Sequence, residues 1–340
     1  MKNKPQDTPY CGVREQKIAA LSLESINAES LDIFLHLINE RYKIHLRKDV
    51  KQISPPFTKD PILKQFRFTN VRREHDKETK WVIRNITSNL DLSYEDKLLN
   101  CFLFRLFNKH ETAELLGMPI HFSEEYNPED YRPKFIDAKK SDPNRVFFTG
   151  VFYTTGMRMG IQQYMPEEVS DNSMEMRVMY FLKHLYDSGF ADKMQSSDID
   201  TQEAACKLIK SYNGIGEFLC YQIFVDMTYI DEFPFSENEY TIAGPGAKSG
   251  LKFLFDHLRD LTPEELIFWL RDHWNDLNQY NTQHGGSATV YPQKLFRDLP
   301  EEDRRMNVMS IENCLCEFSK YYKAVNQLGR PRQKYKGGTK

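Results

Sequence analysis

The chain has 340 residues, of which 40% are hydrophobic, and a formal net charge of −3. This length and apolar content allow a sizeable core in one or two domains, and the charge excludes a generally basic DNA-coating protein. Any nucleic-acid surface must therefore be a local patch. The six cysteines form no Cys-x-x-Cys pair, and no apolar run reaches about 18 residues. We expect reduced thiols, a cytoplasmic location and no membrane span.

Helical periodicity dominates the first half of the chain. Residues 1–25 are expected to form a loose N-terminal lead-in without a secretory signal. Apolar spacing predicts helices over 30–46, 70–86 and 94–116, the last ending at Gly117. The proline-containing stretch 121–145 predicts a loop, and the aromatic stretch 147–153 a strand or a buried helical turn.

The second half continues the helical pattern. Helices are predicted over 172–190, 200–212 and 217–228, with two more starting near Pro263 and Ser310. The basic tail 327–340 contains few apolar residues, so we expect it to be disordered unless it binds a partner. These patterns predict a mainly α protein whose residues 26–326 form a single domain.

The segment Gly214-Ile215-Gly216 lies between two helical patterns, which is typical of a helix-hairpin-helix, here near residues 207–228. Glycine permits a tight turn with positive φ, and the following helix presents free N–H groups that suit a phosphate. Such hairpins commonly hold the DNA backbone without reading bases. The alternative is an ordinary turn between two helices. The candidate DNA-binding residues are Asn213, Gly214, Ile215 and Gly216.

A group of cations precedes this region by more than a hundred residues. Arg73, Lys77, Lys80 and Arg84 are spaced four, three and four apart, with Arg72 beside them. On one helix they would share a face about 16 Å long. That face suits a polyphosphate or the DNA backbone, because arginine binds phosphate in a bidentate manner. Acidic neighbours also fit a plain solvated face, and the sequence alone favours that alternative.

Two carboxylates follow the hairpin at a suggestive distance. In DNA glycosylases built on this hairpin, a catalytic Asp follows about twenty residues later, and here Glu237 and Glu239 occupy that place. Either could take a proton from a nucleophile near a flipped base. The alternative is a pair of exposed loop glutamates. Glu217 and Phe218 stand where a strand-cleaving glycosylase has its Schiff-base lysine, which argues against lyase chemistry.

Two further segments could carry chemistry. Gly244 and Gly246 open a glycine-rich stretch that lacks the P-loop spacing but could offer N–H groups to a phosphate, with charge from Lys248. Nearer the C-terminus, Glu317 and Tyr321 are spaced to share a helix face. A capped turn and a structural Glu–Lys pair are the respective alternatives. The nine histidines form no His-x-His or His-x-x-x-His cluster, so no metal site is predicted.

Several segments occur together in an order that resembles a known family. They are Asp60–Leu63, Phe66–Arg73, Asp76, Thr79-Lys80, Phe148–Gly150, Gly214–Phe218, Tyr221–Ile223, Asp226, Ala243–Ala247 and Cys316–Tyr321. The chain resembles the α-glutamyl/putrescinyl thymine pyrophosphorylases over about residues 30–330. This family is also described as amino acid:DNA transferases, and as the helical domain associated with 5-hydroxymethyluracil DNA kinases.

The resemblance implies a helix-hairpin-helix, DNA-glycosylase-like helical fold and a transferase activity. The enzyme would replace the pyrophosphate of 5-pyrophosphoryloxymethyluracil in DNA with an amine or amino acid, releasing pyrophosphate. Its partners would be double-stranded DNA carrying modified thymine, the amine co-substrate and a 5-hydroxymethyluracil DNA kinase, since these residues hold no kinase P-loop. A phage-encoded enzyme would work in the host cytoplasm.

Site roles follow from the same resemblance. The hairpin would hold DNA for base flipping, and Arg72, Arg73, Lys77, Lys80, Arg84 and Lys248 would bind pyrophosphate. Glu237, Glu239 or Glu317 would deprotonate the amine, and the sequence does not choose among the three. Asp226 is a further candidate catalytic residue. No cofactor is certain, although Mg²⁺ suits a pyrophosphate leaving group and Asp226 could lie near it; no residue is predicted as a metal ligand. The alternatives are a glycosylase that removes a modified base and a non-catalytic DNA-binding module that recruits a kinase.

Overall fold

The computed structural model describes residues 21–169, 173–257, 261–331 and 333–335. The described residues form helices joined by turns and contain no β-strand. Their β-type pairing is limited to isolated bridges such as that between Phe66 and Lys334. The predicted mainly α class is therefore confirmed. None of the described helices is long and apolar enough to cross a membrane.

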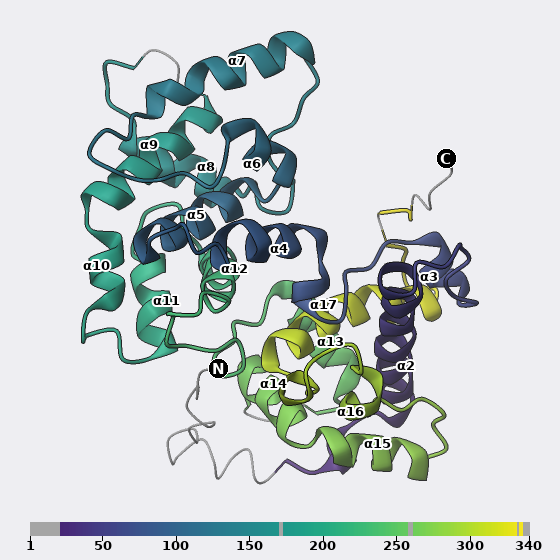
Figure 1. Cartoon of the computed structure of the whole chain (residues 1–340). Coiled ribbons are helices and arrows are strands. Elements are labelled where there is room, and N and C mark those ends of the chain that lie inside the picture. The colour runs from purple at the N-terminus through teal and green to yellow at the C-terminus, as the bar shows by residue number, and fades with distance from the viewer. Residues whose placement is uncertain (1–20, 170–172, 258–260, 332, 336–340) are drawn as a thin grey trace. The chain divides into compact units, whose positions relative to one another are not determined.

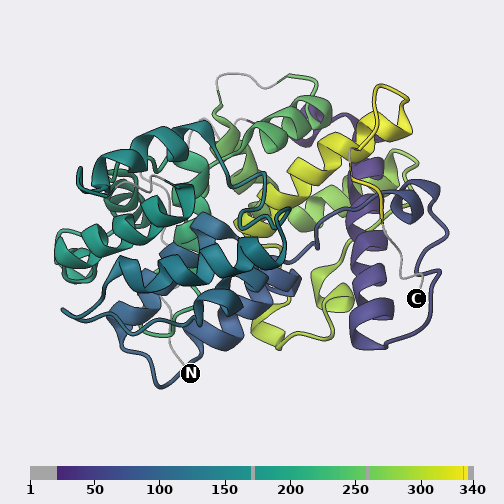
Figure 2. The ribbon, with the colours of Figure 1, turned by 90° about the horizontal axis from the view of Figure 1, so that it is seen from above.

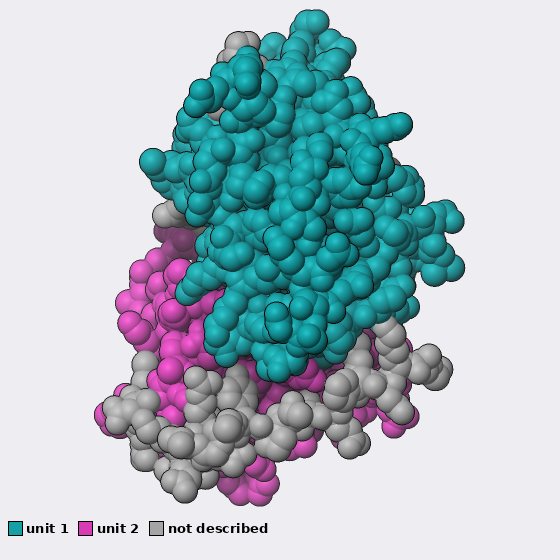
Figure 3. All heavy atoms as spheres, turned by 90° about the vertical axis from the view of Figure 1, so that its left-hand side faces the viewer, with its two compact units in different colours: residues 1–4, 77–236 teal, residues 5–76, 237–340 magenta. Residues whose placement is uncertain are grey.

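The chain divides into two compact units (Figure 3). Of the described residues, 77–236 belong to unit 1, and those before and after this stretch belong to unit 2. The chain passes from one unit to the other at residues 76–77 and 236–237. Within residues 26–326 the chain thus forms two compact units, and the expectation of a single domain stays a prediction.

Unit 1 is built around one nearly buried helix, α5 (Tyr94–Phe107), which contacts α9, α10 and α12. Ser93 caps its first turn by accepting the Asp96 N–H at 3.0 Å. The other elements of this unit are α4 (Lys77–Val82), η4 (Ile83–Thr87), α6 (His110–Leu116), η5 (Pro128–Tyr131), α7 (Arg132–Ser141), α8 (Thr155–Gly160), η6 (Ile161–Tyr164), α9 (Met174–Asp187), α10 (Phe190–Gln195), α11 (Gln202–Lys210) and α12 (Glu217–Met227).

Unit 2 combines segments from both ends of the chain (Figure 1). Its elements are η1 (Leu23–Ser25), α2 (Ala28–His45), η2 (Leu46–Val50), α3 (Pro61–Gln65), η3 (Arg73–His75), α13 (Pro245–Leu254), α14 (Pro263–Asp272), α15 (Trp274–Gln283), α16 (Pro292–Leu295), η7 (Glu301–Asp303) and α17 (Val308–Val325). The long helices α2 and α17 cross (Figure 2), and the Phe34 and Phe318 rings meet between them at 5.1 Å. The core of unit 2 therefore joins segments nearly 300 residues apart.

Helix α17 lies unusually close to α13, and two glycines of α13 permit this approach. A Cβ atom added at Gly246 would lie 2.3 Å from Cys316 Sγ, and one added at Gly250 would lie 2.3 Å from the Leu315 carbonyl oxygen. Real Cβ atoms do not approach other atoms so closely. Because Gly246 and Gly250 are four residues apart, they lie on one face of α13 and let the two backbones touch.

Two predicted helices are interrupted. The prediction of one helix over 70–86 is wrong, because Asp76 takes an extended conformation with ψ 144° between η3 and α4. Its carboxylate accepts the Asn70 backbone N–H and the Asn70 side-chain N–H, both at 3.0 Å. The helix predicted over 94–116 ends at Gly117, which has φ +78°, but it breaks at Asn108, where φ is +48°. Local side-chain bonds and left-handed backbone thus override the helical periodicity.

The predicted loop over 121–145 is also wrong, because it contains η5 and α7. Pro133 lies in the first turn of α7, where the missing N–H costs no hydrogen bond. The stretch 147–153 forms turns and neither a strand nor a regular helix. In the tail, Arg67 N–H donates to the Gln333 carbonyl at 2.9 Å, so residues 333–335 are ordered against the chain before them. Most of the lead-in lies outside the described residues.

We predict that Gly250→Ala destabilises the protein by about 1–3 kcal/mol, because the new methyl group collides with a backbone oxygen that can move only with α17. The matched control is Gly329→Ala, whose Cβ would meet its nearest neighbour at 3.9 Å, an ordinary contact. Urea unfolding of both variants measures the effect. Equal stability of Gly250→Ala and the parent would show that α13 and α17 are not held this closely in solution.

Candidate functional site

The predicted hairpin is a pair of packed helices, α11 and α12, joined by the turn 211–216. Gly214 has φ +94°, and an added Cβ would lie 2.6 Å from the Ile161 side chain, so this position requires glycine. Ile215 is buried and anchors the turn, while Asn213 and Gly216 are exposed. Gly216 precedes the first turn of α12 and has no side chain to cap it. The Asn213 N–H donates to the Tyr164 hydroxyl at 3.0 Å and the Ile215 N–H to the Tyr212 carbonyl at 3.1 Å, so DNA binding by this turn stays a prediction.

The predicted cationic stripe does not form on one helix. Arg72 and Arg73 are buried in unit 2, whereas Lys77, Lys80 and Arg84 are exposed on α4 and η4 in unit 1. The expectation of one continuous face is therefore wrong, because the extended Asp76 separates the two groups. Their predicted role in binding pyrophosphate stays a prediction.

Asp226 lies in a buried ion pair of unit 1. Its carboxylate accepts the Arg105 Nε–H and, at 2.6 Å, an Nη2–H of the same guanidinium. Arg105 also donates to Asn108 Oδ1 at 2.5 Å and to Thr79 Oγ1 at 3.0 Å. Asp226 has no exposed surface. Since a buried charge needs such compensation, this arrangement suits a structural role, and the predicted catalytic role of Asp226 stays a prediction.

In unit 2, Arg72 is held by carboxylate and carbonyl groups. Its Nε donates to Glu74 Oε1 at 2.6 Å, and its Nη1 donates to the Arg305 carbonyl at 2.9 Å. Glu237 Oε1 lies 3.9 Å from Arg72 Nη2 and also accepts an N–H from the Asn307 side chain. The structure therefore brings Arg72 and Glu237, predicted from separate motifs, into one cluster.

The segment that contains Glu237 and Glu239 is held by hydrogen bonds of Asn238 to two other elements. Asn238 Oδ1 accepts the Val308 N–H at 3.2 Å, and its carbonyl accepts an N–H of Arg271 at 2.9 Å. Both glutamates are partly buried. The alternative of two freely exposed loop glutamates is therefore wrong, although neither catalytic role is tested.

The N-terminus of α13 already faces carboxylates. Gly244 N–H donates to Glu312 Oε1 at 3.0 Å, and Ala243 N–H donates to Glu264 Oε1 at 2.9 Å. These acids occupy the N–H groups that a phosphate would use. Gly246 faces α17, as described above, and Lys248 is exposed. Phosphate binding at this helix end stays a prediction, and it would require the carboxylates to move.

Glu312 was not among the candidate site residues predicted from the sequence. It is buried on α17, and burial raises its pKa to about 7, against the opposing effects of the Gly244 N–H and the positive charge of Arg73. A carboxyl group that titrates near neutral pH can both give and take a proton. The sequence signal was an acid among the apolar residues Val308, Met309 and Ile311.

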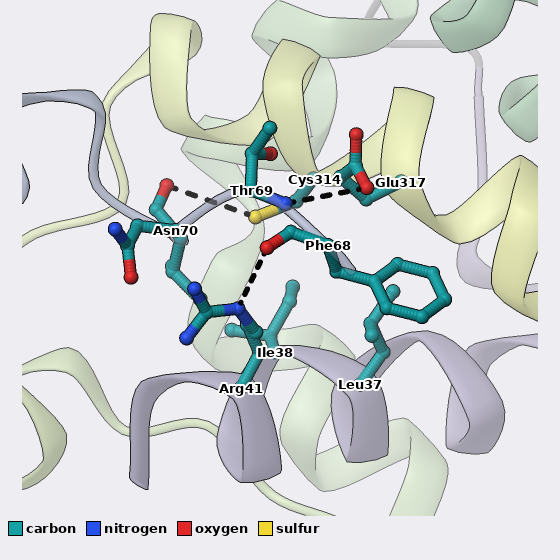
Figure 4. Close-up of a pocket in the computed structure, with 9 residues that line it drawn as sticks. Leu37, Ile38, Arg41, Phe68, Thr69, Asn70, Cys314 and Glu317 are labelled. Atoms are coloured by element: carbon teal, nitrogen blue, oxygen red, sulfur yellow. Dashed lines mark hydrogen bonds between the residues drawn. The ribbon is translucent and has the colours of Figure 1, made fainter. Parts of the chain in front are cut away.

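A small pocket opens beside Glu317 (Figure 4). Arg41 reaches from α2 and donates to the Phe68 carbonyl at 3.2 Å, while Glu317 on α17 accepts the Thr69 N–H at 3.4 Å and a Lys320 N–H at 2.6 Å. The space holds about 10 Å³, enough for about one water molecule. A nucleobase therefore requires the loop 66–76 to move.

Several of the segments on which the family resemblance rests contact one another within unit 2. In unit 2, the loop 66–76 contacts α17 through Thr69 and Glu317, and α13 contacts α17 through Gly244 and Glu312. Tyr321 donates its hydroxyl proton to Asp60, so the first and last segments also meet. The result is a buried cluster of arginines and carboxylates assembled on α17. We call this group the α17 cluster; its members are Arg72, Arg73, Glu237, Glu312 and Glu317.

The chain belongs to the family of helical domains of 5-hmdU DNA kinases, whose model matches residues 28–330. A 5-hmdU DNA kinase of Bacillus phage SP10 is 24% identical over 308 residues, which are 85% of this chain and 44% of that protein. The chain thus spans less than half the length of this relative. No solved structure matches the chain.

We predict a pH-dependent stability that depends on Glu312. Its folded-state pKa of about 7 lies above the ordinary 4.5, so between these values the folded protein keeps a proton that the unfolded chain releases. The stability that Glu312 contributes is full below about pH 4.5 and falls as pH rises to about 7, by up to about 3 kcal/mol.

The test is urea unfolding of the parent and of Glu312→Gln between about pH 5 and about pH 8. Glutamine keeps an oxygen for the Gly244 N–H but does not titrate. The free energy of unfolding of the variant should rise relative to the parent as pH increases. A constant difference across this range would contradict the assignment.

Proposed function

We propose that the chain is a transferase that acts on DNA carrying activated 5-hydroxymethyluracil and releases pyrophosphate. The observation that carries the proposal is the α17 cluster, in which segments far apart in sequence place arginines beside carboxylates. Arginines bind a polyphosphate, and a carboxylate accepts the proton of an attacking amine. Membership of a family named for 5-hmdU DNA kinases supports DNA with this modified base as the substrate.

The proposed reaction is a substitution at the exocyclic methylene carbon of the base. The nitrogen lone pair of the amine forms a C–N bond while the C–O bond to pyrophosphate breaks and its electron pair leaves with the pyrophosphate. The amine nitrogen then loses one proton to a carboxylate. We assign this proton to Glu317, because it lines the pocket and Lys320 lies beside it to balance the charge.

Arg72 and Arg73 would stabilise the leaving pyrophosphate in this scheme. Arg72 contacts Glu74 and lies near Glu237. When pyrophosphate binds, Arg72 would exchange these carboxylates for the phosphate oxygens. Binding by exchange avoids the cost of holding an arginine in the interior without a counter-charge. The substrate therefore opens the loop 66–76 as it binds, which also enlarges the pocket.

A second candidate function is a non-catalytic module that brings a kinase to DNA. It is favoured by the SP10 relative, a 5-hmdU DNA kinase of which this chain covers only 44%. The module predicts DNA binding without turnover of activated DNA. A glycosylase, the remaining alternative, predicts free base and abasic DNA.

One experiment separates these functions. The purified protein is mixed with DNA bearing 5-pyrophosphoryloxymethyluracil and a pool of amino acids and polyamines, and the digested nucleosides are weighed by mass spectrometry. We expect a nucleoside heavier than 5-hydroxymethyldeoxyuridine by one amine minus water. Unchanged nucleosides with tight DNA binding would support the recruiting module, and free base would indicate a glycosylase.

In the same assay, Glu317→Gln should lower kcat by at least about 100-fold, because the general base is lost while shape is kept. DNA binding should not change. Glu203→Gln is the matched control, since Glu203 is exposed on α11 and pairs with Lys207 at 3.1 Å. Full activity of Glu317→Gln would remove this residue from the mechanism, and Glu237→Gln and Glu239→Gln would then identify the base.

The hairpin is tested by adding a negative charge to its exposed turn. Asn213→Asp should weaken binding to double-stranded DNA several-fold, because the new carboxylate repels the phosphate that the turn would hold. Asn144→Asp, at another exposed position of unit 1, should bind as the parent does. Equal affinities of the two variants, measured at one salt concentration, would show that the turn does not face DNA.

A further inference from the structure

Three side chains that belong to no sequence motif converge in unit 2. His45 ends α2, His75 ends η3, and Asp298 lies between α16 and η7. One potential ligand atom of each lies within 4.8 Å of the other two. Both histidines are buried; Asp298 is exposed as a residue through its backbone, and its side chain is 13% exposed. Two imidazoles and a carboxylate form a donor set typical of zinc.

Neighbouring groups orient these three side chains. The Nδ1–H of His45 donates to Asp49 Oδ2 at 2.9 Å, which turns Nε2 of the same ring toward Asp298. Tyr42 donates to the other Asp298 oxygen, Oδ1, at 2.6 Å. In metal sites, a histidine ligand commonly donates a hydrogen bond to a carboxylate, and a carboxylate ligand accepts one from a neighbouring donor. Such hydrogen bonds hold the ligands in the orientation that the metal requires.

One of the three distances between ligand atoms matches a tetrahedral site, and the other two are below 4.8 Å. His45 Nε2 lies 3.4 Å from Asp298 Oδ2. With metal bonds of about 2.0–2.1 Å, two ligand atoms of a tetrahedron are about 3.3–3.4 Å apart. The imidazoles of His45 and His75 are stacked, with centroids 3.9 Å apart. Their planes are 15° apart, so the in-plane nitrogen lone pairs of the two rings do not converge, and the His75 ring must rotate to share an ion with His45.

The local charge also suits a dication. Asp49 and Asp298 supply two carboxylates around the two histidines. Arg72 lies over the Phe296 ring and is already balanced by Glu74 at 2.6 Å. A divalent ion would therefore neutralise the carboxylates without meeting an uncompensated positive charge.

A second cluster offers a useful contrast. Glu78, His110 and Glu111 also lie within reach of one ion, in unit 1. Only one of its members is a histidine, and that ring already contacts Glu78 at 3.0 Å. Lys77 Nζ lies 3.8 Å from Glu111, so a cation there would meet an existing positive charge. The lack of a second imidazole and the nearby lysine therefore set this cluster apart from that of His45, His75 and Asp298.

We propose that His45, His75 and Asp298 bind one Zn²⁺ ion, with a water molecule as the fourth ligand. Imidazole nitrogen selects transition metals over Mg²⁺, so this site is distinct from any Mg²⁺ that accompanies pyrophosphate. The ion ties the end of α2 to η3 and to the loop after α16. Because η3 begins at Arg73, the ion also fixes one end of the loop 66–76.

The test is metal binding by the full chain, first stripped with a chelator. Zn²⁺ is titrated by calorimetry and Co²⁺ by its visible absorption, and thermal unfolding is followed with and without Zn²⁺. We expect one ion per chain, intense tetrahedral Co²⁺ bands that Zn²⁺ displaces, and a rise in Tm. Loss of the site in His75→Gln, and affinity weakened about 10–100-fold in Asp49→Asn, would support the assignment.

The control is His121→Gln, which changes an exposed histidine of unit 1 that contacts Asp96 at 3.2 Å. It should bind as the parent does. Circular dichroism checks that each variant keeps its helices, and Asp298→Asn replaces His75→Gln if the latter unfolds. Absence of Zn²⁺ binding by the parent would overturn the proposal, and so would parent-like affinity in the His75, Asp298 and Asp49 variants.

Discussion

The close approach of α17 to α13 is the constraint on which unit 2 depends. Glycines at 246 and 250 remove the side chains that would keep the two helices apart. Helix α17 then presents Glu312 to the N-terminus of α13 and Glu317 to the loop 66–76. Because one helix carries both carboxylates, a shift of α17 would change the whole cluster together.

The interior charges of unit 2 are balanced at short range, and this balance determines how a ligand could enter. Arg72 contacts Glu74, and Arg73 lowers the pKa of Glu312 against the larger effect of burial. Removing one partner of such a pair costs about 3–5 kcal/mol. An anionic ligand can instead replace the resident carboxylate. Pyrophosphate, the leaving group of the proposed reaction, would keep the arginines paired, whereas a neutral ligand would leave an arginine without a counter-charge.

The sequence predicted what local patterns determine and missed what distant contacts decide. Helix α2 and the stop at Gly117 follow from apolar spacing and from glycine's tolerance of positive φ. The break at Asp76 depends on its bonds to Asn70, and helical spacing alone hides it. The pairing of Arg72 with Glu237 joins residues 165 positions apart, and the burial of Glu312 depends on α13. The spacing of residues along the sequence does not predict such long-range contacts.

The central claim is that the pyrophosphate leaves by cleavage of its bond to carbon. It is tested most directly by placing ¹⁸O in the bridge between the methylene carbon and the phosphorus of the activated base. After turnover with an amine, the account predicts that the label leaves with the pyrophosphate and that the DNA gains nitrogen. Label retained on the DNA as ¹⁸O-hydroxymethyluracil would mean cleavage of the P–O bond, and would contradict the account.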